Sequence, residues 1–307
     1  MEFLIEQKDN GRLVRDFLRS VGVSASLAAR LKRKEQGIVL NGQRVTVRAR
    51  LQAGDSLVLA IEDTAAPEKA VPLAVATDIV AKTGNYLAVN KPPFMPTHPS
   101  HGHYTDTLAN ALTYAMQGEE VAFRPRFINR LDRNTSGIVL VARHALAAAV
   151  LSRSMVEGKF QKGYLALVCG RVDAPAVIET GIRRRDESVI ERVTCPLGEG
   201  DDALTVLTPL LFDDALSLVK LEPRTGRTHQ LRVHMASIGH PILGDDLYGT
   251  ADERIGRHAL HAGALCFPDP VSGELMRVFA PLPADMRGVL KDHFGEEGVF
   301  VAEKAFG

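Results

Sequence analysis

The stretch RLDRNTSG at residues 130–137, with the apolar run IVLVA that follows at residues 138–142, is the most informative part of this sequence. The apolar run predicts a buried β-strand, and the turn before it presents Asp132 at the mouth of that strand. Arg130 and Arg133 place positive charge on both sides of the carboxylate, which favours its ionised form. A carboxylate nucleophile requires this arrangement. Taken alone, the same pattern also describes a surface aspartate paired with arginine.

Three more blocks occur along the chain: LAVNKPP at 87–93, KGYLALVCG at 162–170 and TGRTHQLRVHMA at 225–236. The first predicts a strand ended by a proline turn, and the second predicts an alternating strand. The third predicts a turn that leads into a helix, and GHPILGD follows it at 239–245.

These blocks and the RLDxxTSG string together resemble the signature of the RluA/RluD-type pseudouridine synthases, which isomerise uridine within structured RNA. The resemblance covers nearly all of the chain and includes LHAGALCF at residues 260–267. The sequence departs from the family at Asp269 and at Asn129, where many members have histidine. We expect Asp269 to affect only a turn. Asn129 can still hydrogen-bond to backbone, so catalysis should be preserved.

The resemblance implies three catalytic residues. Asp132 would be the nucleophile, or the base that starts elimination, and Arg232 would be the partner of its carboxylate. Tyr164 would lie against the target base, where an aromatic ring offers a stacking platform for an extruded pyrimidine; its hydroxyl could also relay a proton at carbon 5. Attack on the sugar, attack on the ring and elimination all stay open for Asp132.

Further residues are expected to contact the RNA because they are charged or polar and stand in or beside the same motifs. They are Lys91, His98, Arg130, Arg133, Thr135, Arg227, His229 and Gln230.

No cofactor or metal is expected. The isomerisation needs no redox step or group donor, and the chain has no dinucleotide fingerprint, P-loop or zinc-ligand spacing. The clusters His98, His101, His103 and His229, His234 could suggest metal ligands, but each lacks the further ligands of a zinc site.

The N-terminal segment carries a separate signal. Residues 1–50 hold eleven Lys and Arg against five Asp and Glu, a net charge of +6 on a chain whose 37 basic and 37 acidic residues cancel. Ser24 is a plausible cap for a basic helix running to about Gln36, and Asn41-Gly42 predicts a hairpin turn. The segment resembles the RNA-binding domain of ribosomal protein S-four. Its helix would contact phosphates through Arg30, Arg33 and Lys34.

We therefore predict four parts: an RNA-binding domain at 1–62, a linker at 63–77, a catalytic domain at 78–295 and a tail at 296–307. The expected fold class is α+β, with a mixed, mainly antiparallel sheet and flanking helices in the catalytic domain, and a small α/β domain before it. Three scattered cysteines, a short acidic N-terminus and no apolar run near the ~20 residues of a membrane span predict a soluble cytoplasmic protein. We expect a monomer whose partner is RNA, ribosomal RNA ahead of transfer RNA.

Two other functions are compatible with parts of the sequence. An RNA-binding or ribosome assembly factor without activity predicts the loss of Asp132, Tyr164 or Arg232, and all three residues are present. A metal-dependent hydrolase built on the histidines predicts bound zinc.

Overall fold

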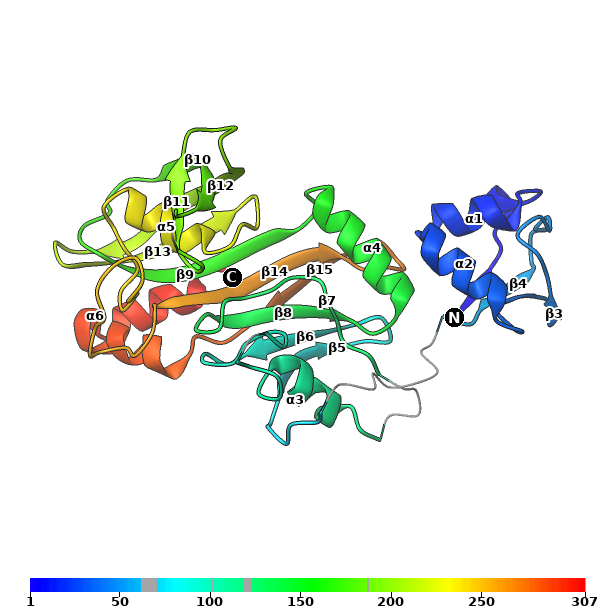
Figure 1. The fold of residues 1–307 in the computed structure, drawn as a ribbon, viewed down its shortest axis with the longest axis horizontal. Coiled ribbons are helices and arrows are strands. Elements are labelled where there is room, and N and C mark those ends of the chain that lie inside the picture. Colours follow the sequence, from blue (N-terminus) through cyan, green and yellow to red (C-terminus); the bar gives the residue numbers. More distant parts are fainter. Residues whose placement is uncertain (62–70, 101, 119–122, 187, 307) are drawn as a thin grey trace.

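A computed structural model describes residues 1–61, 71–100, 102–118, 123–186 and 188–306. The first of these ranges forms an N-terminal module with a four-stranded sheet in the order β1-β4-β2-β3 and two α-helices packed on it (Figure 1). Its elements are β1 (Glu2–Leu4), the 3-10 helix η1 (Gln7–Asp9), α1 (Val14–Ser20), α2 (Ala25–Arg33), β2 (Ile38–Leu40), β3 (Gln43–Arg44) and β4 (Ser56–Leu59).

Two local signals in the module are confirmed. The Ser24 side chain accepts a hydrogen bond from the backbone N–H of Leu27 and so caps α2. Asn41 and Gly42 have φ angles of 49° and 80°. A two-residue turn with both φ angles positive matches the twist of the strands it joins, here β2 and β3.

The predicted linker begins in a segment, residues 63–70, that lies outside the described residues. Residues 71–77 have neither helix nor strand. They lie against α3 (Leu108–Ala115), because the Asn110 side chain donates to the carbonyl of Val71 at 2.7 Å.

The rest of the chain is built on an 11-stranded sheet, with the path β11-β10-β12-β13-β9-β14-β8-β6-β5 and with β15 on β14 and β7 on β8. The mixed α+β class with a mainly antiparallel sheet is confirmed, because every described strand pair in this sheet except β8 with β14 is antiparallel. The strands are β5 (Asp78–Lys82), β6 (Tyr86–Lys91), β7 (Arg126–Phe127), β8 (Ser136–Ala142), β9 (Gln161–Cys169), β10 (Ala176–Arg184), β11 (Arg192–Cys195), β12 (Asp201–Phe212), β13 (Leu216–Pro223), β14 (Leu260–Pro268) and β15 (Leu275–Phe279). Besides α3, the helices are α4 (Ala145–Val156), α5 (Gln230–Ser237) and α6 (Ala284–Lys304).

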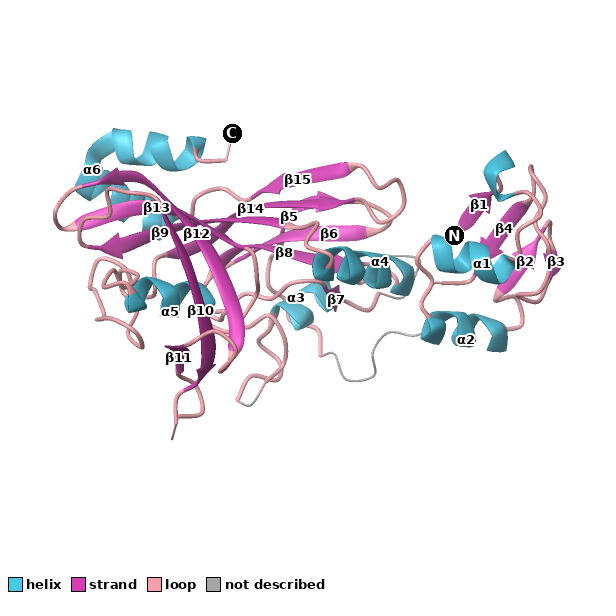
Figure 2. Cartoon of the chain, turned by 90° about the horizontal axis from the view of Figure 1, so that it is seen from above, coloured by secondary structure: helices cyan, strands magenta, loops and turns pink. Residues whose placement is uncertain are grey.

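The junction of β8 and β14 joins the two halves of the sheet (Figure 2). Ser136 lies opposite His261, and Gly137 lies opposite Ala262. Gly137 has a φ of 113°, and a Cβ atom built on it would lie 2.2 Å from the Ala262 carbonyl oxygen. Only glycine fits this close approach of two backbones.

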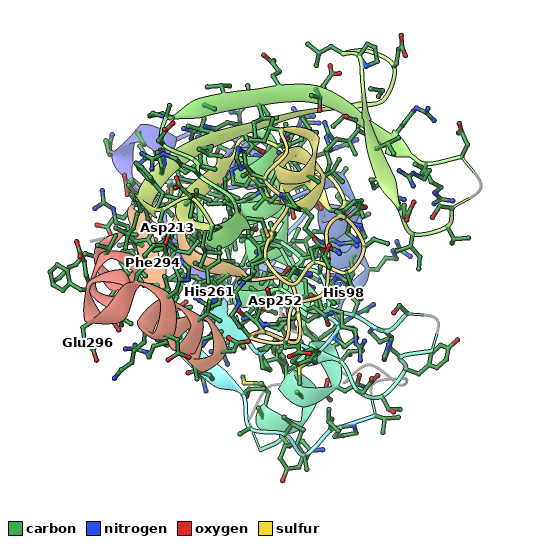
Figure 3. All side chains as sticks on the ribbon, turned by 90° about the vertical axis from the view of Figure 1, so that its left-hand side faces the viewer. His98, Asp213, Asp252, His261, Phe294 and Glu296 are labelled. Carbon is green, nitrogen blue, oxygen red and sulfur yellow. The ribbon has the colours of Figure 1, made fainter. Side chains whose placement is uncertain are left out.

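The segment predicted as a tail, 296–307, is largely helical in the structure. α6 continues to Lys304 after a bend at Gly295, and Val299 and Ala302 are buried in the main core cluster. Just before the bend, the His293 ring bonds to Asp213 at 2.8 Å. Figure 3 shows Asp213 near Phe294, the residue that follows His293. Among the described residues, no helix is both long and apolar enough to cross a membrane.

Candidate active site

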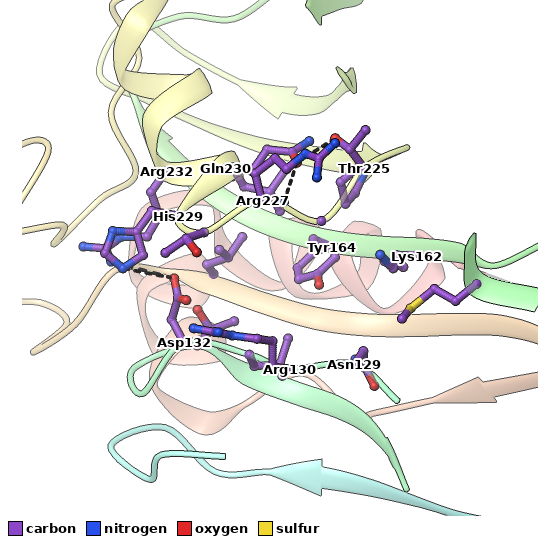
Figure 4. A pocket seen from close by; sticks show the side chains of 18 of the residues that line it. Asn129, Arg130, Asp132, Lys162, Tyr164, Thr225, Arg227, His229, Gln230 and Arg232 are labelled. Atoms are coloured by element: carbon purple, nitrogen blue, oxygen red, sulfur yellow. Dashed lines mark hydrogen bonds and ion pairs between the residues drawn. The ribbon is translucent and has the colours of Figure 1, made fainter. Parts of the chain in front are cut away.

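A cavity of about 670 Å³ opens between the two halves of the large sheet. Most of its lining comes from four regions that are far apart in the sequence: residues 127–132 with Thr135, the C-terminal end of α4, the start of β9, and residues 223–232 at the end of β13 and the start of α5. His98 and Leu260 complete it. Figure 4 shows Asp132, Tyr164, His229 and Arg232 around it. The cavity therefore exists only when distant segments are folded together.

Asp132 reaches this cavity from the loop that precedes β8, and its side chain is 23% exposed. Two buried basic side chains hold the next two backbone carbonyls of the loop. Lys91 Nζ donates to Arg133 O at 3.1 Å, and Arg257 Nη1 donates to Asn134 O at 3.0 Å. These bonds fix the direction in which the loop presents its carboxylate.

Arg232 faces Asp132 across the cavity, with Nη1 3.8 Å from Asp132 Oδ2. Its stronger partner is Asp245, whose two oxygens accept from Nε and Nη2 at 2.7 Å each. Burial would by itself raise the pKa of Asp245, but the hydrogen bonds and charge of Arg232 outweigh it and lower that pKa. A bidentate pair of this kind fixes the guanidinium plane, so Asp245 sets the position of Arg232 beside Asp132.

His229 lies on the same side of the carboxylate, with Nε2 4.0 Å from Asp132 Oδ2. It stands directly before α5 with a φ of 57°, in the left-handed region that non-glycine residues rarely adopt. Its Nδ1 is 2.8 Å from the Tyr248 hydroxyl. Burial lowers the pKa of His229, so the ring is neutral at pH 7 and its contact with Asp132 is polar rather than ionic.

Tyr164 forms the wall opposite this cluster. It lies on β9 opposite Leu221 of β13 and packs against two core clusters. Burial, with a smaller effect of the Asp132 charge, raises the pKa of Tyr164 well above its ordinary value. The phenol therefore stays protonated at neutral pH. It can stack or donate a hydrogen bond, but it is a poor base for carbon 5.

Comparison with known proteins identifies the kind of site. The family described as RNA pseudouridylate synthase matches residues 85–237, which include Asp132, Tyr164 and Arg232. The uncharacterised RNA pseudouridine synthase YjbO of Bacillus subtilis is 36% identical over 279 residues, covering 91% of this chain and 98% of that protein. The chain belongs to the RNA pseudouridine synthase family.

Other members are similar in sequence and in structure. Ribosomal large subunit pseudouridine synthase D of Zymomonas mobilis is 34% identical to this synthase, covering 87% of this chain and 91% of that one. The solved structure of Human RNA Pseudouridylate Synthase Domain Containing 1 is 33% identical, with a TM-score of 0.55, and covers 67% of this chain and 83% of that chain. This synthase is thus an isomerase of the RluA type.

Three of the residues predicted to contact RNA are buried in the synthase. Lys91 is 0% exposed, and its Nζ donates to three backbone carbonyls. Thr135 is buried against His258. Gln230 lines the cavity but is only 4% exposed, and it bonds to Thr225 and Leu204. All three side chains already bond to protein groups, and Thr135 and Gln230 also line the active-site cavity, so their contact with RNA stays a prediction.

The other predicted contacts are open to solvent or line a cavity. Arg130 and Arg227 are exposed on the rim of the active-site cavity, and His98 lines it. Burial, assisted by the charge of Arg130, lowers the pKa of His98. Arg133 is exposed but is not among the residues that line the cavity.

The basic residues predicted on the N-terminal helix, Arg30, Arg33 and Lys34, line a second cavity. Of the histidine clusters weighed as metal ligands in the sequence, His101 lies outside the described residues, and His103 bonds to Asp106. Within the described part of the chain, no group of three or more His, Cys, Asp or Glu side chains is arranged to hold a metal ion.

Sequence reasoning missed several residues of the synthase that the structure brings to the site. They are Lys162, Asp245, Tyr248, Arg257 and His258. Asp245 ends the GHPILGD block, so it stands in a motif, but the sequence does not indicate that it pairs with Arg232. Arg257 could not be found from local pattern because the loop that it holds lies 123 positions away.

Proposed function

We propose that this synthase isomerises a specific uridine in ribosomal RNA of the large subunit, with Asp132 as the reacting carboxylate. The observation that carries the assignment is the geometry of that group. Asp132 projects into a deep cavity, 3.8 Å from an arginine that a second, buried aspartate holds in place. The ribosomal substrate is supported by the 34% identical Zymomonas protein, whose name assigns it to the large ribosomal subunit. Transfer RNA is the alternative substrate.

The reaction breaks the bond between the ribose and N1 of uracil, turns the ring, and forms a bond from the ribose to carbon 5. The hydrogen on carbon 5 leaves as a proton, and N1, which is no longer bonded to the ribose, takes up a proton from solvent. The target nucleotide must first leave its stack, at a cost of a few kcal/mol. Asp132 then attacks the sugar or the ring, or removes a ribose proton to start elimination. Arg232 positions this carboxylate, while Tyr164, as a neutral phenol, packs against the turned base.

The N-terminal module supplies RNA affinity in this proposal. Its net positive charge and the basic residues of α2 suit contacts to the phosphate backbone, which bind RNA with little sequence preference. We propose an RNA-binding domain at 1–62 and a catalytic domain that begins at residue 78 and includes α6 to Lys304, because α6 packs in its core. A ribosomal substrate places the synthase in the cytoplasm. We expect the synthase to act as a monomer.

Tritium release from RNA labelled at carbon 5 of uridine tests the proposal. The wild type should release tritium. Asp132→Asn keeps the size and polarity of the side chain but removes its charge, so release should fall by about 10³-fold or more while the Kd for RNA changes little. Asp186→Asn, the same change at a surface aspartate 84% exposed, is the control and should behave as wild type. Substantial turnover by Asp132→Asn would remove Asp132 from the reaction.

A further inference from the structure

A second cavity, of about 630 Å³, lies where the N-terminal module meets the catalytic part of the chain. We name it the seam cavity; it is lined by residues of α2 and its N-terminal cap, by Arg126 of β7, and by Ala145 and Ala148 of α4. We propose that the seam cavity binds one backbone phosphate of the substrate RNA, close to the target uridine. The inference rests on the proposed function and adds a contact shared by both parts of the molecule.

The N-terminal module and α4 of the catalytic part pack against each other beside the seam cavity. Leu146 of α4 belongs to the hydrophobic cluster of the N-terminal module, and Ala145 and Val150 pack against the same cluster. A Cβ atom added at Gly22 would lie 2.4 Å from Val150 Cγ2, so the surfaces are in close contact. Figures 1 and 2 show α2 and α4 as neighbours across this interface. The seam cavity is thus enclosed by packed elements on both sides.

The main evidence for a ligand in the seam cavity comes from the side chain of Arg30. Its Nε and Nη2 atoms are buried, and neither has a hydrogen-bond partner among the described residues. Buried guanidinium N–H groups without an acceptor cost free energy, and an oxyanion is the partner whose geometry matches their fork. The residue therefore presents two ready donors to an anion.

The other charges of the seam cavity have the same sign. Arg33, Lys34 and Arg126 line it with Arg30, and the remaining described lining residues are serine, leucine and alanine. Lys34 and Arg126 bond to the backbone carbonyls of Ala60 and Arg124, so their charges add to those of Arg30 and Arg33 while they keep partners of their own. A phosphate bound in the seam cavity is attracted by this positive charge and supplies an acceptor for Arg30.

The position of the seam cavity selects RNA as the source of the phosphate. Arg126 lines the seam cavity, whereas Phe127, the next residue of β7, lines the active-site cavity. Along α4, Ala148 lines the seam cavity and Met155 lines the active-site cavity. Seven helical residues span about 10 Å, and the charges of one stacked strand recur about every 3.4 Å along its axis. A strand that leaves the active-site cavity beside Met155 therefore reaches the seam cavity after about three further nucleotides.

Salt-dependent binding gives the first test. Arg30→Gln is compared with Arg15→Gln, an exposed arginine of the same module that is already paired with Asp16. With ribosomal RNA, Arg30→Gln should bind roughly tenfold more weakly at low salt. It should also reduce the slope of log K against log salt by about 0.7 to 0.9, the amount for one phosphate contact. Arg15→Gln should keep the wild-type slope.

A structural role for Arg30 is tested in the absence of RNA. Because its buried N–H groups have no described partner, Arg30→Gln should unfold at the wild-type temperature or above it. A clear fall in the unfolding temperature, together with an unchanged salt slope, overturns the proposal. At saturating RNA, kcat should stay at the wild-type value, since Arg30 does not line the active-site cavity.

A phosphate scan gives the decisive test. The RNA fragment that carries the modified uridine is made with one methylphosphonate linkage at a time, up to four nucleotides on either side. One neutral linkage should weaken wild-type binding by roughly the same factor as Arg30→Gln and should leave Arg30→Gln itself unaffected. If every linkage weakens both proteins equally, the seam cavity does not hold a phosphate. Absence of tritium release by the wild type, with the salt slopes as expected, would overturn the proposed function alone.

Discussion

Arg232 shares its guanidinium unequally between two carboxylates. Two of its nitrogens hold Asp245 at 2.7 Å, and a third lies 3.8 Å from Asp132. The face of the guanidinium lies 5.0 Å from the ring centre of Tyr248. The arginine is therefore oriented before any substrate arrives, and catalysis requires such preorganisation.

Asp245→Asn tests this positioning role. The change leaves a buried arginine without its charged partner, which should lower the free energy of unfolding by about 3 to 5 kcal/mol. Tritium release should fall by about 10-fold or more, because Arg232 is no longer fixed beside Asp132. Urea unfolding and the tritium assay measure the two effects.

The matched control is Asp252→Asn, at a partly exposed pair in which Asp252 bonds to Arg254 at 2.7 Å. Breaking such a surface pair should cost at most about 1 kcal/mol and leave turnover unchanged. Wild-type turnover by Asp245→Asn, under conditions where it is folded, would show that Arg232 needs no such support.

Part of the site could be predicted residue by residue, and part could not. Asp132, Tyr164 and Arg232 stand in motifs, and the structure places all three around one cavity. Lys91 stands in a motif too, but a motif does not tell whether a polar side chain faces substrate or holds a loop. Arg257 was missed because it acts on backbone far away in the sequence.

At the scale of elements, the sheet is most constrained where β8 meets β14. The strands β6, β8 and β9 and the helix α5 were all predicted, because their apolar patterns and turn residues are local signals. The pairing of β8 with β14 was not, since it joins residues about 125 positions apart. Gly137 marks this junction in the sequence, but a glycine alone does not reveal which backbone approaches it.

Gly137→Ala should break this junction. The new methyl group would lie 2.2 Å from a backbone oxygen that cannot move without shifting β14, so we expect a loss of several kcal/mol in unfolding free energy, beyond the ~1–2 kcal/mol of a left-handed alanine. Gly158→Ala is the control, because Gly158 has a φ of 72° but no described heavy atom within 4 Å of an added Cβ. Urea unfolding compares the two, and equal losses would show that the close approach is relieved without cost.

Across the whole molecule, three buried histidines bond to hydroxyl groups and are held neutral. His234 bonds to Thr205, His258 to Thr135 and His261 to Ser136, at 2.8 to 2.9 Å. Burial is the main cause that lowers the pKa of each ring to about 4. His261 of β14 and His258, which lies just before β14, bond to residues at the start of β8. Protonation of these two rings would therefore weaken the junction of β8 and β14.

These histidines predict acid sensitivity in a defined window. Between pH 6.5 and about 4 the unfolded chain takes up protons at these positions and the folded chain does not, so stability falls as pH falls. Each ring should contribute a slope of up to about 1.4 kcal/mol per pH unit. Urea unfolding at pH 7, 6 and 5 measures the total change in the free energy of unfolding. His261→Gln should reduce its slope against pH by up to about 1.4 kcal/mol per pH unit, the contribution of one proton. A stability that does not change across this range would show that the rings titrate normally in the fold.

The long separation between β8 and β14 also has a consequence during protein synthesis. A nascent chain that has reached residue 250 already contains Asp132, Tyr164 and Arg232, yet it lacks β14 and the arginine that holds the catalytic loop. Contacts of such high sequence separation form late, after most of the chain has emerged. We therefore expect ribosome-bound intermediates to be inert toward the RNA around them, so that translation of β14 turns the enzyme on.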